Sequence, residues 1–166
     1  ITGDVFFDPF NRGRYATDAS FYQIMPFGVV LPRSMDEALR ALAIARDDGR
    51  VVTPRGGGTS QCGQTVNEGI VVDFSKHLNR IVSLDVANRI CVVEPGIVLD
   101  DLNRQLRKHG LWFPVDVSTA SRATISLPGA PASMSDTISA TSITVTATAS
   151  RIEPNGSPSR SASTSA

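Results

Sequence analysis

The sequence has few cysteines, no net charge and no long hydrophobic run, and each absence excludes a class of protein. Sixteen basic and sixteen acidic residues cancel among the 166, so no overall positive charge attracts nucleic acid or an anionic membrane. No apolar run approaches the roughly 20 residues that a membrane-spanning helix needs, and no basic stretch followed by an apolar core marks a signal peptide. We therefore expect no nucleic-acid partner and no transmembrane segment.

Cysteine and histidine are too sparse to indicate a metal site or a disulfide framework. Cys62 and Cys91 lie far apart in the sequence, and we expect both to be buried free thiols in a reducing compartment. His77 and His109 have no third ligand at metal spacing, so no metal is expected. These features favour a cytoplasmic protein, with peripheral membrane attachment left open. Because the chain begins at Ile1 rather than Met, we expect a processed or partial product, and missing N-terminal targeting is left open too.

Short apolar runs alternate with two helix signatures up to about residue 125 and predict an α+β fold with mixed sheets flanked by helices. In the first signature, Ser34 is placed to cap the helix, Glu37 to reach back to it, and Gly49 to end it. Residues 1–22 show no sustained period, and we expect loop and short turns there. The expected strands lie within 27–34, 50–57 and 69–75, with a hairpin in 80–96 that turns at Asn88. The expected helices lie within 34–49, with an apolar stripe of Met35, Ala38, Leu39, Leu42 and Ala45, and within 98–110, where Gly110 is the stop.

The composition changes abruptly at Ser126. From there to Ala166 the chain is dominated by Ser, Thr, Ala and Pro and has no aromatic residue. We expect this segment to be disordered, because it cannot bury enough apolar surface to offset the cost of ordering. An edge strand within Ile138–Ser150 is left open, because β-branched and small residues alternate there. We expect the segment to arise from a reading-frame change, a deletion or a misjoined exon, with a genuine disordered tail as the alternative. The expected domains are thus 1–125 and 126–166.

Three consecutive glycines, Gly56 to Gly58, follow a short apolar run and precede Thr59 and Ser60. Backbone amides without Cβ atoms in the way can surround an anion closely, and the two hydroxyls add donors at the rim. The alternative is an ordinary tight or flexible connection between strands. A Walker loop would need a Gly-Lys-Ser/Thr ending, and Gln61 stands where a Rossmann turn needs its third glycine, so both are excluded.

Several motifs in a fixed order surround this loop. They are "RYATDAS" and "VVLPRS" before it, "PRGGGTSQCGQ" in it, and "VEPG" and "PVDVSTASRATI" after it. Over roughly Arg12 to Ile125, the chain resembles the FAD-binding domain (PCMH type) of flavoproteins related to vanillyl-alcohol oxidase. It is most similar there to FAD-linked dehydrogenases of D-lactate, glycolate and D-2-hydroxyglutarate. The resemblance implies hydride transfer from a small 2-hydroxy acid to FAD, with an electron acceptor that the sequence does not identify.

The resemblance also implies which residues bind FAD. The glycine loop would surround the pyrophosphate, the "EPG" segment would line the cofactor, and the last segment would run beside its flavin and adenosine portions. Members with covalently linked flavin carry a His at the position of Gly58, so a non-covalent flavin is implied here. From sequence alone, Arg55 faces either a phosphate or a surface salt-bridge partner. The implied cofactor-binding residues are Pro54, Arg55, Gly56, Gly57, Gly58, Thr59, Ser60, Gly63, Gln64, Glu94, Pro95, Gly96, Pro114, Asp116, Ser118, Ser121, Ala123, Thr124 and Ile125.

The resemblance stops after Ile125. Enzymes of this family usually continue with two glycines, then more sheet, then a substrate domain that carries the catalytic bases, whereas this chain continues with "SLPGAPAS". No residue is therefore assigned as catalytic, and we expect the chain alone to be inactive. A non-catalytic module that binds another phosphate ligand, or none, is the alternative function.

Overall fold

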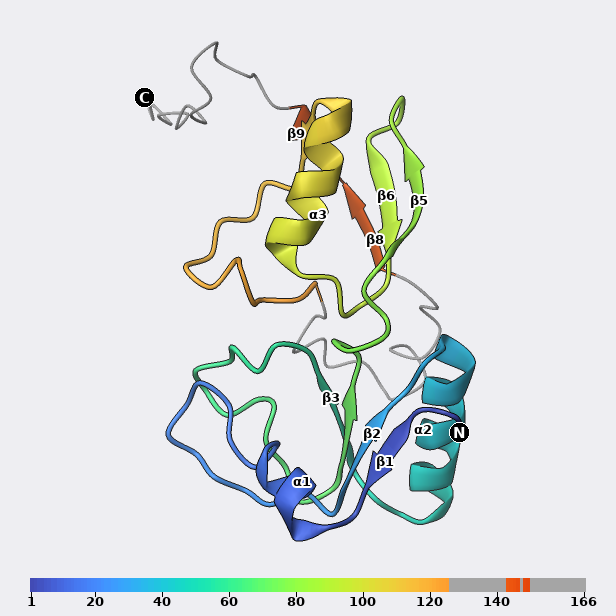
Figure 1. Ribbon diagram of the computed structural model, residues 1–166, viewed down its shortest axis with the longest axis vertical. Coiled ribbons are helices and arrows are strands. Elements are labelled where there is room, and N and C mark those ends of the chain that lie inside the picture. The colour runs from blue at the N-terminus through green and yellow to red at the C-terminus, as the bar shows by residue number, and fades with distance from the viewer. Residues whose placement is uncertain (126–142, 147, 150–166) are drawn as a thin grey trace.

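The computed structural model describes residues 1–125, 143–146 and 148–149, and in these residues helices flank mixed sheets, as the sequence predicts (Figure 1). Within them the strands form three sheets, in the orders β1-β2-β4-β3, β5-β6-β8 and β7-β9. Helix α2 lies beside the first sheet and helix α3 beside the second, toward opposite ends of the molecule (Figure 1). The elements are β1 (Asp4–Phe6), α1 (Pro9–Gly13), β2 (Gly28–Leu31), α2 (Met35–Asp47), β3 (Val52–Arg55), β4 (Ile70–Asp73), β5 (Ile81–Asp85), β6 (Ile90–Val93), α3 (Leu99–Leu106), the 3₁₀ turn η1 (Arg107–His109), β7 (Leu111–Trp112), β8 (Ile143–Thr146) and β9 (Thr148–Ala149).

The first sheet is built around apolar strands that are buried on both faces. β2, β4 and β3 run parallel, and β1 pairs antiparallel with β2 at one edge. Every residue of β2 and β4 is buried, which is why neither strand alternates between apolar and polar positions. Ala41 and Ala45 of α2 pack on one face, and Tyr15 packs with Val29 and Val71 on the other. The strands expected in this half are confirmed with shorter bounds.

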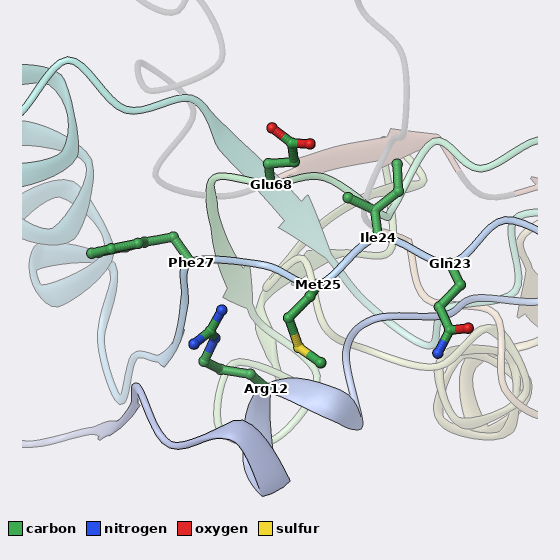
Figure 2. Close-up of a pocket in the computed structure, with 6 residues that line it drawn as sticks. All are labelled: Arg12, Gln23, Ile24, Met25, Phe27 and Glu68. Atoms are coloured by element: carbon green, nitrogen blue, oxygen red, sulfur yellow. The ribbon is translucent and has the colours of Figure 1, made fainter.

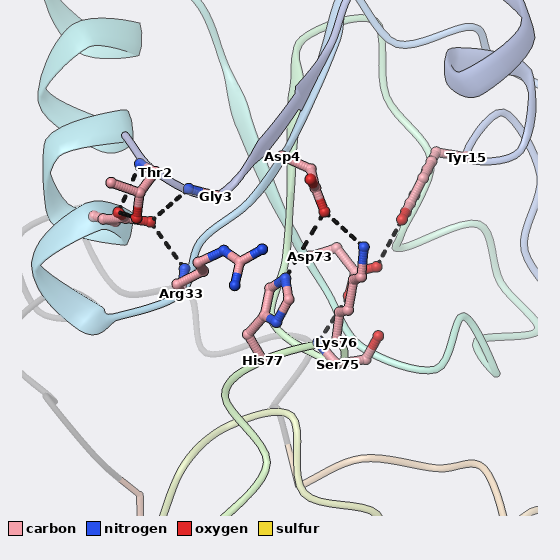
Figure 3. Close-up of polar contacts among 10 residues, drawn as sticks. Thr2, Gly3, Asp4, Tyr15, Arg33, Asp73, Ser75, Lys76 and His77 are labelled. Carbon is pink, nitrogen blue, oxygen red and sulfur yellow. Dashed lines mark hydrogen bonds and ion pairs between the residues drawn. The ribbon is translucent and has the colours of Figure 1, made fainter.

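Helix α2 is confirmed, but its capping differs from the prediction. The Ser34 hydroxyl accepts a hydrogen bond from the Glu37 amide at 3.2 Å, as expected. The Glu37 carboxylate does not reach back to Ser34. It accepts instead from the amides of Arg33 at 2.9 Å, Thr2 at 2.8 Å and Gly3 at 3.2 Å (Figure 3). Glu37 therefore fastens the N-terminal residues to the start of the helix.

The buried face of α2 is made of alanines. Ala38 and Ala45 are buried as expected, and Ala41 lies between them in the core. The three larger members of the expected stripe, including Leu39 and Leu42, are only half-buried. Small side chains let the helix approach the sheet closely, so the leucines are displaced to the sides of the contact.

The first 22 residues contain regular structure that the sequence analysis missed. β1 forms there because it pairs with β2, and Asp4 is tied to Lys76 by a 2.6 Å ion pair (Figure 3). α1 follows because Pro9 opens it and the Asp8 carboxylate accepts from the amide of Asn11 at 2.9 Å. Elements of three to five residues are too short to show a hydrophobic period, so the expectation of loop and turns was wrong at these two places.

The second half is organised around α3. β5 and β6 form the expected hairpin, where Asn88 donates from its amide to Asp85, and Arg89 has the positive φ of 58°. Gly110, with φ 68°, ends the helical segment as predicted. Cys91 is buried as expected, but Cys62 is exposed. None of the helices in the described residues is long and apolar enough to cross a membrane. The core here comprises Cys91, Val93, Ile97, Leu102, Leu106 and Leu111.

Two short strands come from the segment for which we expected disorder. β8 pairs antiparallel with β6, and β9 pairs antiparallel with β7. The alternative of an edge strand within 138–150 is therefore confirmed for residues 143–146 and 148–149, and the expectation of disorder is wrong there. Alternating β-branched residues in the sequence account for it. The rest of the expected disordered segment, including residues 126–142 and 150–166, lies outside the described residues.

Replacing Glu37 by Gln is expected to remove a pH-dependent contribution to stability. Hydrogen bonds from Arg33 and Thr2 lower the pKa of Glu37 from 4.5 to about 2. A lowered pKa means that the charged carboxylate stabilises the fold. This contribution is complete above pH 4.5 and disappears as the pH falls through about 2. Thermal unfolding from pH 2 to 7 checks this: wild type should melt above Glu37→Gln at neutral pH, and the two should converge in acid. A difference in melting temperature that does not change with pH would contradict it.

Candidate cofactor-binding site

The glycine loop packs directly against the segment 119–125. A Cβ atom at Gly56 would overlap the side chain of Thr124, and one at Gly57 would overlap the carbonyl oxygen of Arg122. Any larger residue at either position would therefore separate the two segments. The structure thus brings together two of the three segments that the resemblance assigned to FAD.

The segment 119–125 is in turn held by the first turn of α3. Val98, the residue before the helix, makes no side-chain cap. The amides of Leu99 and Asp100 donate instead to the carbonyls of Ala123 and Ala120, at 2.9 and 3.1 Å, and the amide of Ile125 donates to Ile97 at 3.0 Å. These bonds satisfy amides that a helix leaves unpaired at its start. The position of the glycine loop is therefore coupled to α3.

Arg55 lies beneath the loop and is buried, with 8% of its surface exposed. Its guanidinium donates to three carbonyl oxygens, of Tyr15 at 3.1 Å, Thr17 at 2.7 Å and Thr65 at 3.3 Å. A Cβ at Gly58 would lie only 2.8 Å from this guanidinium. The surface salt bridge left open for Arg55 is wrong. A direct contact with phosphate stays a prediction.

A second buried polar contact supports the same region. The hydroxyl of Tyr15 donates to Asp73 at 2.9 Å, and the amide of Ser75 donates to the other carboxylate oxygen at 2.8 Å (Figure 3). Burial and the neighbouring Asp73 raise the pKa of Tyr15, so its hydroxyl stays protonated. Burial lowers the pKa of Arg55, but a guanidinium stays charged at neutral pH. The segment that contains Tyr15 is thus fastened to the ends of β3 and β4.

A cavity of about 360 Å³ lies where the glycine loop, the segment 119–125 and the N-terminal segment meet. Glycine-loop residues, threonines and three arginines line it, so an anion is the ligand that it suits. The amide of Ala19 donates to the carbonyl of Gly58 at 3.0 Å and joins two parts of this wall. The lining residues are Arg14, Thr17, Asp18, Ala19, Arg55, Gly57, Gly58, Thr59, Thr119 and Arg122.

Other implied cofactor residues lie outside this cavity. Glu94 is buried and accepts from the amide of Arg80 at 2.9 Å, and the amide of Gly96 donates to Leu78 at 2.7 Å. These contacts hold the end of β6 against the chain that follows β4. Ser60 and Gln64 contact each other near the end of the loop, where Gly63 has φ 74°. Pro114, Asp116 and Ser118 are exposed, and Ser121 and Ala123 flank Arg122 without lining the cavity. Cofactor contacts for these residues stay predictions.

Several residues that line the cavity were not expected from the sequence. Arg14, Thr17 and Asp18 of the "RYATDAS" motif belong to the wall, although the motif entered only through the resemblance. Arg122 also lines the cavity, although only its two neighbours were expected at the site. The "RYATDAS" motif lies some 40 residues before the loop in the sequence. The hydrogen bonds from Arg55 to Tyr15 and Thr17, which lie 40 and 38 residues earlier, bring the motif and the loop together.

A larger cavity, of about 440 Å³, lies away from the glycine loop and is lined by Arg12, Gln23, Ile24, Met25, Phe27 and Glu68 (Figure 2). The guanidinium of Arg12 already donates to the carbonyls of Pro26 at 2.6 Å and Phe7 at 3.4 Å. No cluster of three potential metal ligands occurs among the residues that the structure describes. The arginine of this cavity is therefore already bound to backbone carbonyls.

Replacing Arg55 by Met is expected to destabilise the fold by about 3 kcal/mol, because three carbonyl oxygens, two of them in buried contacts, would lose a donor. Urea unfolding of the two proteins measures this difference. Arg40→Met on the exposed side of α2 is the control and should change stability by less than about 0.5 kcal/mol. Equal stability of the two variants would show that Arg55 does not organise the region.

Comparison with known proteins identifies the family of the chain. The family described as "FAD binding domain" matches residues 26–135, so the match runs beyond Ile125. The chain is 43% identical over 128 residues to D-2-hydroxyglutarate dehydrogenase of Pantoea ananatis, which covers 75% of this chain and 12% of that protein. It is 39% identical over 129 residues to the glycolate oxidase subunit GlcD of Bacillus subtilis, covering 75% and 27%. The chain thus spans only a small part of these relatives.

Solved structures show the same fold. An alkyldihydroxyacetonephosphate synthase superposes with a TM-score of 0.66 at 21% identity, over 73% of this chain and 25% of that one. A BBE-like 1 variant from Physcomitrella patens superposes with a TM-score of 0.65 at 21% identity, over 75% and 28%. Since the family match alone covers more than half of the chain, the protein belongs to the FAD-binding domain family of the PCMH-type flavoproteins.

Proposed function

We propose that this chain supplies the pyrophosphate-binding part of a flavoenzyme that oxidises a small D-2-hydroxy acid with non-covalent FAD. The observation that carries the proposal is the glycine loop, whose glycines pack closely against 119–125 beside a cavity lined by three arginines. The names of two relatives, D-2-hydroxyglutarate dehydrogenase and glycolate oxidase subunit GlcD, support this substrate class. When bound, FAD supplies the hydride acceptor.

The unpaired backbone amides of the loop make it suitable for a pyrophosphate. The amides of Gly57, Gly58 and Thr59 donate to no other residue in the described part of the chain. Backbone amides seldom lack partners unless water or a ligand binds them. Consecutive free amides on a loop with a positive φ of 64° at Gly58 are typical of anion sites. The chain's role would be to bind and orient the cofactor through these groups.

The proposal for this chain covers cofactor binding and leaves out proton abstraction and electron transfer to an acceptor. No described residue is proposed as the base that takes the hydroxyl proton of the substrate, and the electron acceptor is not assigned. The chain spans 12% and 13% of two D-2-hydroxyglutarate dehydrogenases. The oxidation of a hydroxy acid is therefore proposed for the complete gene product and not for this chain alone. The cytoplasmic location expected from the cysteine content also stays a prediction.

Gly57→Val in the complete gene product is expected to abolish retention of FAD while the protein remains folded. A side chain at this position meets the carbonyl of Arg122 and would push the loop away from 119–125. Gly13→Val is the matched control, because a Cβ there meets no atom within 4 Å. Flavin absorbance per protein after gel filtration measures retention, and circular dichroism checks folding. Full flavin content in folded Gly57→Val would remove the loop from the binding role.

Acid precipitation of the complete holoprotein is expected to release all flavin into the supernatant. The reason is that Gly58 occupies the position at which covalent members carry a His, and glycine offers no atom for a flavin link. Absorbance of the pellet and the supernatant measures the partition. Yellow colour that stays with the pellet would show a covalent bond and contradict this part of the proposal.

A further inference from the structure

We propose that Arg14 and Arg122 bind the pyrophosphate of FAD and supply the positive charge that the glycine loop lacks. This inference rests on the proposed function and adds two residues to which no role has been assigned. Both line the cavity that Gly57, Gly58 and Thr59 share. They come from segments more than 100 residues apart, so only the fold brings them to one site.

The backbone positions of both arginines are set by contacts with the loop and its support. Arg14 precedes Tyr15, whose carbonyl accepts from the buried Arg55 at 3.1 Å. The carbonyl of Arg122 lies where a Cβ at Gly57 would be, so its backbone touches the loop. The amide of Arg122 donates to Thr119 at 2.8 Å within a tight turn. Both arginines therefore extend from ordered backbone next to the loop.

The two side chains are also uncommitted. Arg14 and Arg122 are exposed, and neither forms an ion pair with any residue in the described ranges. Arg55 differs, because its donors are bound to backbone carbonyls. Such an arginine beside a row of free amides is available to an anionic ligand, and charge-assisted bonds to phosphate are among the strong ones.

Asp18 is the one carboxylate among the described residues that line the cavity, and it does not cancel the arginines. It accepts from the amide of Ser20 at 2.8 Å and from the hydroxyl of Thr65 at 3.0 Å. Partial burial raises the pKa of Asp18, but the bonds from Ser20 and Thr65 lower it by more, so its pKa lies below the ordinary value. The Asp18 carboxylate thus already has hydrogen-bond partners, and the other charged residues that line the cavity in the described ranges are arginines.

The carboxylate of the hydroxy acid is the other anion that two arginines can bind. The pyrophosphate is favoured because the free amides of Gly57, Gly58 and Thr59 adjoin the same cavity, and a phosphate group accepts from amides and guanidinium groups together. ADP separates the two sources, because it carries the pyrophosphate but neither the flavin nor a carboxylate.

The test uses the apo form of the complete gene product with Arg14→Gln, Arg122→Gln and the double variant. Arg40→Gln, an exposed arginine on α2 away from the cavity, is the control. Affinities for FAD and for ADP are measured by titration calorimetry at low and high salt. Each single variant should bind both ligands about tenfold more weakly, and the double variant about 100-fold, as expected for charge-assisted bonds. The double variant should also lose most of the salt dependence of the wild type, and Arg40→Gln should match the wild type.

Three results would overturn the inference. Unchanged FAD and ADP affinities in folded variants would show that the arginines do not bind pyrophosphate. Equal losses in Arg40→Gln would show only a long-range effect of net charge. A raised KM for a D-2-hydroxy acid with unchanged FAD affinity would assign the arginines to the substrate carboxylate. Failure of the wild type to bind either FAD or ADP would instead contradict the proposed function itself.

Discussion

The close approach of two backbones, the glycine loop and the segment 119–125, is the constraint on which the rest of the site depends. It requires that Gly56 and Gly57 carry no Cβ, because Thr124 and the carbonyl of Arg122 occupy that space. The segment 119–125 is fixed to α3 through its carbonyl groups, and the loop continues from β3 of the first sheet. The contact therefore joins the two halves of the domain at the place where the anion-binding cavity lies.

Buried polar groups give this contact its shape. Arg55 donates to carbonyls of the N-terminal segment and of the chain that leaves the loop, and Tyr15 donates to Asp73 at the end of β4. Leaving such groups unpaired costs more than pairing them gains, so the network specifies one arrangement of loop and N-terminal segment. The amides of Gly57, Gly58 and Thr59 stay outside the network. The fold thus satisfies the groups below the loop and leaves those on it for a ligand.

Sequence patterns predicted the parts of this arrangement that depend on local chemistry. α2, α3 and the buried strands were found because apolar periodicity, Ser34 and Gly110 mark them within a few residues. β1 was missed because its pairing with β2, rather than a local pattern, creates it. α1 was missed because it has only five residues. The burial of Arg55 was missed because its partners lie 10 to 40 residues away. Arg122 was passed over because an exposed arginine in a sequence is indistinguishable from solvated surface until a cavity is seen beside it.

Hydrogen exchange of the complete gene product with and without FAD tests the central claim most directly. The free amides of Gly57, Gly58 and Thr59 should exchange rapidly without ligand and become protected when FAD binds, because the pyrophosphate would accept their hydrogen bonds. Residues 119–125 should gain protection with them, since the two segments are in contact, while the exposed side of α2 should not change. Saturation with FAD that leaves the exchange of the loop unaltered would contradict the account.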